Sequence, residues 1–123
     1  DVNNVYVSAI NQGADPFAAL LELPLRHAGQ IHLAGFSESF DSSGVRLLID
    51  NHGASVDNAV WTLFDTALAR VGPLPTLLER DQNIPAFDVL VAEVGLADAK
   101  LARANRSMEA AALVQAMTPE AVR

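Results

Sequence analysis

The feature that most limits how this chain can fold is an alternation of strand-like runs with longer helical segments. Apolar residues at helical spacing predict a helix over Val56 to Val71, which Ser55 caps and Gly72-Pro73 ends. Strand-like runs lie on both sides of it, at Gly29 to Ala34 and at Pro75 to Asp81. Strands that alternate with helices of ten or more residues are typical of βα units in a parallel sheet. The chain is therefore predicted to be an α/β protein.

The first part of the chain is less regular. Asp1 to Asn4 is typical of the end of a strand, and Val5 to Asn11 is either a loop or a helical turn. Asp15 followed by Pro16 predicts the start of a helix over Phe17 to Leu23, because Asp is a good cap and Pro suits the first helical position. One short helix is therefore expected ahead of the first strand-like run.

Two segments separate that run from the central helix. Ser37 to Val45 is polar, contains a glycine and is predicted as a loop. Leu47 to Ile49 is apolar and is either a short strand or a plug beneath a long loop.

The C-terminal part is predicted to be helical in two pieces. One helix opens at Ile84-Pro85 and continues to about Ala104; Ser107 caps a last segment, Met108 to Met117, before Thr118-Pro119. No boundary divides the chain, so residues 1–123 are expected to form a single domain, with about 105–123 as a C-terminal helical extension.

Charge and composition exclude several functions. The formal net charge of the 123 residues is -7, with 15 acidic against 8 basic residues, which argues against a large nucleic-acid surface. The absence of cysteine excludes disulfides, thiolate metal sites and cysteine nucleophiles. No apolar run approaches the roughly 20 residues that span a bilayer, and no segment has the pattern of a signal peptide. We therefore expect a cytoplasmic protein without a membrane partner.

His32 lies in the middle of a strand-like run that ends in a glycine turn. Strand alternation places Gln30, His32 and Ala34 on one face, and Ile31 and Leu33 on the other, where covering helices can bury them. A polar side chain on a buried face is costly without a partner. We predict that the partner of His32 is a metal; an ordinary hydrogen-bonded histidine is the alternative.

Further side chains with metal-binding chemistry lie at the ends of strand-like runs or just after them. The candidate ligands are Asp1, Asn4, His32, Asp50, His52 and Glu79. In parallel α/β architectures this edge of the sheet holds the active site. Imidazole with carboxylate oxygen suits iron, manganese or zinc, and the lack of thiolate disfavours a closed structural zinc site.

Each candidate also has an ordinary interpretation. Asp50 could cap the turn that follows it. Glu79 lies in a run of leucines, and a buried carboxylate needs a cation or several donors. Two further residues, Asp81 and Gln30, are predicted to hydrogen-bond to the ligands without binding the metal. Asp81 would fix the tautomer of an imidazole, and Gln30 lies beside His32.

Several motifs occur in an order that resembles a known family. They are Asp-Val-Asn-Asn-Val-Tyr-Val-Ser, Gln-Ile-His-Leu-Ala-Gly, Leu-Ile-Asp-Asn-His-Gly, Val-Trp-Thr-Leu-Phe and Pro-Thr-Leu-Leu-Glu-Arg-Asp-Gln-Asn-Ile-Pro. Together they resemble the C-terminal part of the DUF692 (UPF0276) family, the multinuclear non-haem iron-dependent oxidases. The resemblance covers Asp1 to about Ala99.

The resemblance implies a (β/α)8 TIM barrel of the xylose isomerase type. This chain would supply roughly the last two to three βα units, from the end of the sixth strand onward, as a fragment of a longer protein. The family's ligand pattern falls on Asn4, His32, Asp50, His52 and Glu79, with Asp1 beside them.

The family's chemistry implies a cofactor and partners. Two or three irons with dioxygen would modify a Cys-containing peptide, which a small partner protein presents; zinc or manganese is the alternative metal. Phe36 stands where the family commonly has His, Asn51 where it has Thr, and Arg80 where it has Trp. The departures at Phe36 and Arg80 bear on substrate identity more than on metal binding.

Three functions follow from these observations. The first is part of an iron-dependent oxidase that modifies a peptide at Cys, active as the full-length protein and inactive as an isolated fragment. The second is a metal-dependent hydrolase or isomerase on a barrel of the xylose isomerase or endonuclease IV type, which would not need dioxygen. The third is a non-catalytic fragment that forms a homo-oligomer through exposed strand edges. No residue is singled out as a general acid or base.

Overall fold

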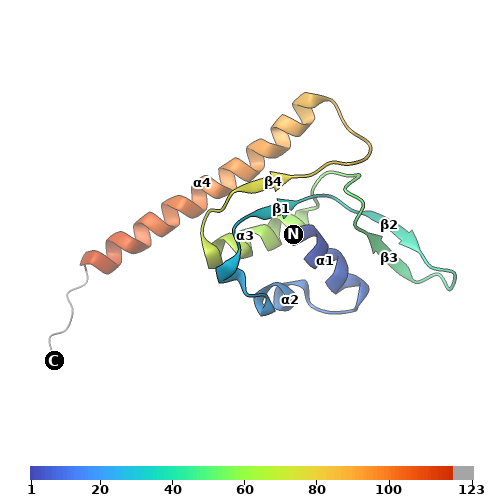
Figure 1. The fold of residues 1–123 in the computed structure, drawn as a ribbon, viewed down its shortest axis with the longest axis horizontal. Coiled ribbons are helices and arrows are strands. Elements are labelled where there is room, and N and C mark those ends of the chain that lie inside the picture. Colours follow the sequence, from blue (N-terminus) through green and yellow to red (C-terminus); the bar gives the residue numbers. More distant parts are fainter. Residues whose placement is uncertain (118–123) are drawn as a thin grey trace.

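The computed structural model describes residues 1–117 of the chain (Figure 1). Its elements in chain order are α1 (Val2–Asn11), α2 (Pro16–Glu22), the short 3-10 helix η1 (Leu25–His27), β1 (Ile31–Leu33), β2 (Ser37–Phe40), β3 (Arg46–Ile49), α3 (Asn58–Val71), β4 (Thr76–Leu78) and α4 (Phe87–Met117). The chain is thus a mixed α/β structure with short strands, as the alternation of segments predicts.

The two strands on either side of α3 pair in parallel. β1 and β4 lie side by side, with Ile31 opposite Thr76 and Leu33 opposite Leu78. The N–H of Glu79 donates to the carbonyl of Leu33 at 2.8 Å and extends this pairing beyond β4. Because paired parallel strands end at the same edge, the residues that follow β1 and β4 are brought together. The predicted parallel pairing is confirmed.

The core lies where α3 packs against β1 and the first two helices. The side chains buried there include Val2, Leu20, Ile31, Leu33, Val60, Trp61, Leu63, Phe64, Ala67 and Leu68. The rings of Trp61 and Phe64 meet edge to face within this core, with centroids 6.1 Å apart. Ile31 and Leu33 face this core, which leaves His32 on the opposite side of β1.

The prediction that Asp1 to Asn4 ends a strand is wrong. The segment is helical from Val2, and the helix includes all of Val5 to Asn11, which the sequence left undecided. Asp1 is the cap, since its Oδ1 accepts from the N–H of Asn4 at 2.8 Å. Val2, Asn3, Val7 and Ala9 are buried along one side, so packing stabilises a helix whose sequence is rich in β-branched valine.

The prediction that Ser37 to Val45 forms a loop is wrong for its first four residues and correct for residues 41–45, which form the turn of a hairpin. Ser37–Phe40 forms β2, which pairs antiparallel with β3 in a hairpin, and Ser37 lies opposite Ile49. Polar Ser-Glu-Ser-Phe has little strand character by itself, and the partner strand supplies its hydrogen bonds. The strand interpretation of Leu47 to Ile49 is therefore the correct one.

Three helix boundaries differ from expectation, while the start of α2 agrees with it. The first is the start of α4, which lies at Phe87 rather than at Ile84-Pro85. α2 begins at Pro16 with Asp15 as its cap, as predicted. α3 is capped by Asp57 rather than Ser55 and begins at Asn58. Ser107 does not begin a new segment, because its hydroxyl donates to the carbonyl of Arg103 inside one continuous helix α4.

The end predicted at Thr118-Pro119 lies outside the described residues, as does the last part of the expected extension. Within residues 1–117, no helix combines the length and apolarity needed to cross a membrane.

Candidate metal centre

His32 and Glu79 meet at the edge where β1 and β4 end. His32 is the middle residue of β1, and Glu79 follows β4 directly. Nδ1 of His32 lies 3.2 Å from Oε1 of Glu79. The parallel register brings these residues together, although they are far apart in the sequence. This is the edge at which the sequence predicts the site.

His52 lies in the loop after β3 and joins the same cluster. Its Nδ1 lies 3.5 Å from Oε2 of Glu79 and 3.1 Å from Oδ2 of Asp81, while its Nε2 lies 3.1 Å from Oδ1 of Asp50. Its backbone φ is 52°, in the left-handed region that few residues other than glycine adopt. The loop therefore holds the imidazole between carboxylates at the cost of an unfavourable backbone conformation.

In its neutral form, His52 cannot donate a hydrogen bond from both ring nitrogens. A neutral imidazole carries one N–H, so one ring nitrogen can donate to a carboxylate while the other presents a lone pair. Both nitrogens nevertheless lie near carboxylate oxygens. A second proton on the ring, or a cation next to the unprotonated nitrogen, would each remove this conflict.

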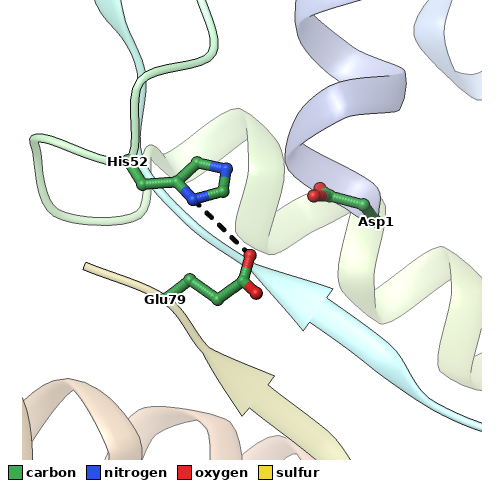
Figure 2. Close-up of side chains that lie close together, drawn as sticks. All are labelled: Asp1, His52 and Glu79. Carbon is green, nitrogen blue, oxygen red and sulfur yellow. Dashed lines mark ion pairs between the residues drawn. The ribbon is translucent and has the colours of Figure 1, made fainter. Parts of the chain in front are cut away.

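Asp1 completes a group with metal-binding geometry. One ligand atom each from Asp1, His52 and Glu79 lies within 4.8 Å of the other two. Figure 2 shows the Asp1 carboxylate across from the His52 ring and the Glu79 carboxylate, with His52 and Glu79 joined as an ion pair. Asp1 is exposed, whereas the other two are partly buried. The three come from the start of α1, the loop after β3 and the end of β4.

Two neighbouring amides hold Asp50. Nδ2 of Asn3 donates to Oδ1 of Asp50 at 2.5 Å, and Nδ2 of Asn4 donates to Oδ2 at 3.0 Å. Asn3 is fully buried, and its Oδ1 is the buried side-chain polar atom without a hydrogen-bond partner among residues 1–117. Asn4, the predicted ligand, is exposed and uses its nitrogen on Asp50, so its oxygen stays available.

Sequence reasoning missed Asn3. The signal was the helical register, which turns Val2 and Asn3 inward and Asn4 outward once Asp1 is recognised as a cap. An amide on the buried side of a helix needs a polar partner, and Asp50 is that partner.

The two residues predicted to support the ligands occupy different places. Asp81 contacts His52 through its carboxylate and also through the backbone, since its N–H donates to the His52 carbonyl at 3.0 Å. Gln30 is exposed, and in the described part of the chain no hydrogen bond joins it to a candidate ligand. Asp81 is thus positioned to orient an imidazole, whereas no contact among the described residues gives Gln30 that role.

The cluster contains four carboxylates and two imidazoles. Asp1, Asp50, Glu79 and Asp81 supply hard oxygen donors, a set that with imidazole suits iron, manganese or zinc. The adjacent cation, Arg80, does not neutralise them, because its guanidinium pairs with Glu93 instead. Like charges held this close repel each other, and a bound cation would offset that repulsion. The residues present therefore fit a metal ion.

Comparison with known proteins shows similarity over most of the chain. A family described as RiPP precursor modification enzyme MbnB/TglH/ChrH matches residues 1–102. A UPF0276 protein of Bordetella parapertussis is 55% identical over 103 residues, which are 84% of this chain and 36% of that protein. A UPF0276 protein of Caulobacter vibrioides is 50% identical over 111 residues, 90% of this chain and 39% of that protein.

A UPF0276 protein of Acaryochloris marina is 50% identical over 101 residues, 82% of this chain and 35% of that protein. The chain thus spans little more than a third of the length of these curated relatives. No solved structure matches the chain.

Proposed function

The chain belongs to the MbnB/TglH/ChrH family of RiPP precursor modification enzymes, and from this premise we propose that it forms part of the metal centre of an iron-dependent oxidase. RiPPs are ribosomally made peptides that are modified after translation, so enzymes of this family act on peptide substrates. The proposed substrate is a precursor peptide modified at Cys. The activity would belong to the full-length protein, of which this chain covers a part.

The observation that best supports a metal is the position of Glu79 between two histidines. Its Oε1 faces His32 and its Oε2 faces His52, so this carboxylate lies within reach of both imidazoles. We assign metal binding to His32, His52, Glu79, Asp50 and Asn4, with Asp1 as an additional ligand. Iron, two or three ions in the full-length protein, would supply the redox chemistry with dioxygen that amino-acid side chains lack.

The surrounding residues would hold these ligands in place. Asp81 would fix the orientation and tautomer of His52 through the 3.1 Å contact with its Nδ1. Asn3 and Asn4 would keep the Asp50 carboxylate turned toward Nε2 of His52. The part that these residues would play in the reaction is therefore to hold and orient the metal ligands.

A TIM barrel is the architecture we propose for the complete protein. The parallel pair β1–β4, with α3 between the strands in sequence and α4 after β4, is consistent with two successive βα units. Candidate ligands at the carboxyl ends of both strands agree with where barrel enzymes hold their sites. A small partner protein that presents the peptide is proposed from the family resemblance.

The proposal is tested on the full-length protein purified without oxygen. Iron at one or more equivalents is expected, together with peptide modification that stops when dioxygen is removed. His32→Ala and Glu79→Ala should each lose metal, while His27→Ala, an exposed histidine in η1, should keep it. Normal metal content in both site variants would contradict the assignment. Zinc or manganese with dioxygen-independent turnover would instead favour the hydrolase or isomerase alternative.

A further inference from the structure

The hairpin formed by β2 and β3 is connected at both ends to the candidate metal centre. β1, which carries His32, leads through residues 34–36 into β2, and Asp50 directly follows the end of β3. In Figure 1 the turn end of the hairpin projects beyond the helices, while β3 lies beside α1. At its base, Nδ2 of Asn51 donates to the hydroxyl of Ser37 at 3.0 Å. A molecule bound along this hairpin would therefore have one end beside the site.

The outer edge of β3 is already occupied by a side chain of α1. The N–H of Leu48 donates to Oδ1 of Asn11, and its carbonyl accepts from Nδ2 of Asn11, both at 2.8 Å. The Asn11 amide thus makes the two hydrogen bonds that a neighbouring strand would make. These bonds also show that the backbone groups of Leu48 point away from β2.

The register of the hairpin then identifies the free groups of β2. In an antiparallel pair, opposite residues alternate between those that bond to each other and those whose N–H and carbonyl point outward. Leu48 lies opposite Glu38, and two residues along, Arg46 lies opposite Phe40. Glu38 and Phe40 therefore present their N–H and carbonyl groups on the outer edge of β2. The hydrogen bond from Asp41 N–H to the Val45 carbonyl, at 2.9 Å, fits this alternation.

Within residues 1–117 this sheet has two strands, so the outer edge of β2 pairs with no third strand. Neither Pro nor Lys interrupts the edge, although these are common devices for blocking strand addition. The Glu38 carboxylate forms an ion pair with Arg46, which lowers the pKa of Glu38. What the edge offers is therefore main-chain hydrogen bonding rather than net charge.

Exposed apolar side chains accompany these free backbone groups. Phe40 is 65% exposed, and Val45 and Ile49 are also exposed on the hairpin. A ligand that matches this surface has alternating main-chain donors and acceptors and some apolar side chains. An extended peptide has both properties, and strand addition is an established way for proteins to bind one.

We propose that the outer edge of β2 binds an extended segment of the precursor peptide as an added strand. Glu38 and Phe40 would supply the main-chain hydrogen bonds, and Phe40 an apolar contact. The end of the segment beside Ser37 would lead toward Asp50 and His52. This inference rests on the proposed function, because membership of a peptide-modifying family identifies the occupant as a peptide.

The test uses the full-length protein and a defined probe. The probe is a blocked, fluorescein-labelled octapeptide of alternating Val and Thr with one central Cys, and binding is measured by fluorescence anisotropy. Phe40→Pro removes the outward N–H at an edge position where Pro fits, and Phe40→Ala removes the same side chain but keeps the N–H. We expect Phe40→Pro to bind about fivefold more weakly than Phe40→Ala, the effect of one main-chain hydrogen bond.

Amide hydrogen exchange provides the second readout. In the wild-type protein, the probe should slow exchange of the Glu38 and Phe40 amides and leave those of Ser39 and Asp41, which point inward, unchanged. Equal binding by the two Phe40 variants would overturn the proposal. Slow exchange of the Glu38 and Phe40 amides without the probe would also overturn it, because another part of the protein would then cover the edge. Slowing that depends on protein concentration would identify that cover as a second copy, and slowing that does not would identify it as another segment of the full-length chain.

Metal content separates this inference from the proposed function. Protection of Glu38 and Phe40 by the probe in a protein that binds no iron would support strand addition and count against the oxidase. Normal iron content without such protection would overturn strand addition alone.

Discussion

Arg80 and Glu93 form an ion pair that is almost completely shielded from solvent. Nη2 of Arg80 lies 3.1 Å from Oε2 of Glu93, and each side chain is 8% exposed. Oε1 of Glu93 also accepts from the N–H of Val56 at 2.6 Å, and Arg80 donates to the hydroxyl of Ser55. The pair thus connects the end of β4, helix α4 and the loop before α3. Since Glu79 precedes Arg80, this connection helps to fix the position of Glu79.

Removing one partner of this ion pair should destabilise the protein more than removing both partners together. Arg80→Met leaves a buried carboxylate without its cation and is expected to cost about 3–5 kcal/mol in the free energy of unfolding. Arg80→Met combined with Glu93→Leu should cost less than Arg80→Met alone. Urea denaturation of the single and double variants measures both. If the two single costs simply add in the double variant, the pair is not coupled.

Replacing Asp81 should weaken metal binding without removing a ligand. Asp81→Asn keeps the size of the side chain but removes the charge that faces Nδ1 of His52. Loss of such an outer partner typically lowers metal affinity by about 10–100-fold. Competition with a chelator measures the affinity, and Asp88→Asn in the first turn of α4 is the matched control. An unchanged affinity would show that Asp81 does not orient His52.

Asn3 should matter more for stability than its exposed neighbour. Asn3→Leu removes the partly buried hydrogen bond to Asp50, and hydrogen bonds to charged groups contribute about 1.5–3 kcal/mol. The substitution also removes the buried Oδ1 that has no hydrogen-bond partner, and this gain should offset part of the loss. Asn4→Ala removes a solvent-exposed hydrogen bond and should cost less. Thermal unfolding of the two variants compares them, and a larger loss for Asn4→Ala would contradict this account.

Gly35 is required by the close approach of two backbone segments. A Cβ at residue 35 would overlap the carbonyl of Ala54, in the loop between His52 and α3. Gly35→Ala should therefore displace that loop and destabilise the protein by about 1–3 kcal/mol. Gly95→Ala is the control, because open space surrounds residue 95 and alanine favours a helix there by about 1 kcal/mol. The free energy of unfolding, measured by urea denaturation, should fall for Gly35→Ala and rise for Gly95→Ala.

The turn of the hairpin should depend on pH through Asp41. Its carboxylate accepts from the hydroxyl and N–H of Ser43 and from the N–H of Val45, and these bonds hold the pKa of Asp41 below its usual 3.8. Because the folded pKa is the lower one, the stabilisation is complete above pH 3.8 and is lost as the pH falls through the folded pKa.

Amide exchange in the turn, followed as the pH is lowered, measures this change. Asp41→Asn should abolish the pH dependence. A turn whose relative exchange rates stay constant through the titration would contradict the assignment.

The sequence predicted the elements whose pattern is local and regular. The spacing of apolar residues in α3, the Asp15-Pro16 start of α2 and the alternation around His32 each correspond to the structure within a few residues. It failed for α1 and for β2. In α1, Asp1 to Asn4 is typical of the end of a strand, but burial of one side of the helix decided the outcome. In β2, a polar strand formed because β3 supplied its partner.

For the site, residue type was more informative than geometry. The chemistry of His and carboxylate at strand ends pointed to His32, His52 and Glu79, which the structure brings together. The inward direction of Asn3 depended on recognising a helix, and the partner of Arg80 lies 13 residues away on α4. Such contacts come from tertiary packing, which no pattern within one segment contains.

The crossover between β1 and β4 has a consequence for when the site forms during folding. The side chains of the candidate metal centre come from positions as far apart in the chain as Asp1 and Glu79. They can meet only after α3 has docked and the two strands have paired. Closing so long a loop is entropically costly and slow compared with forming any single helix. Metal uptake would then be a late event in folding, and metal release an early sign that the two strands have separated.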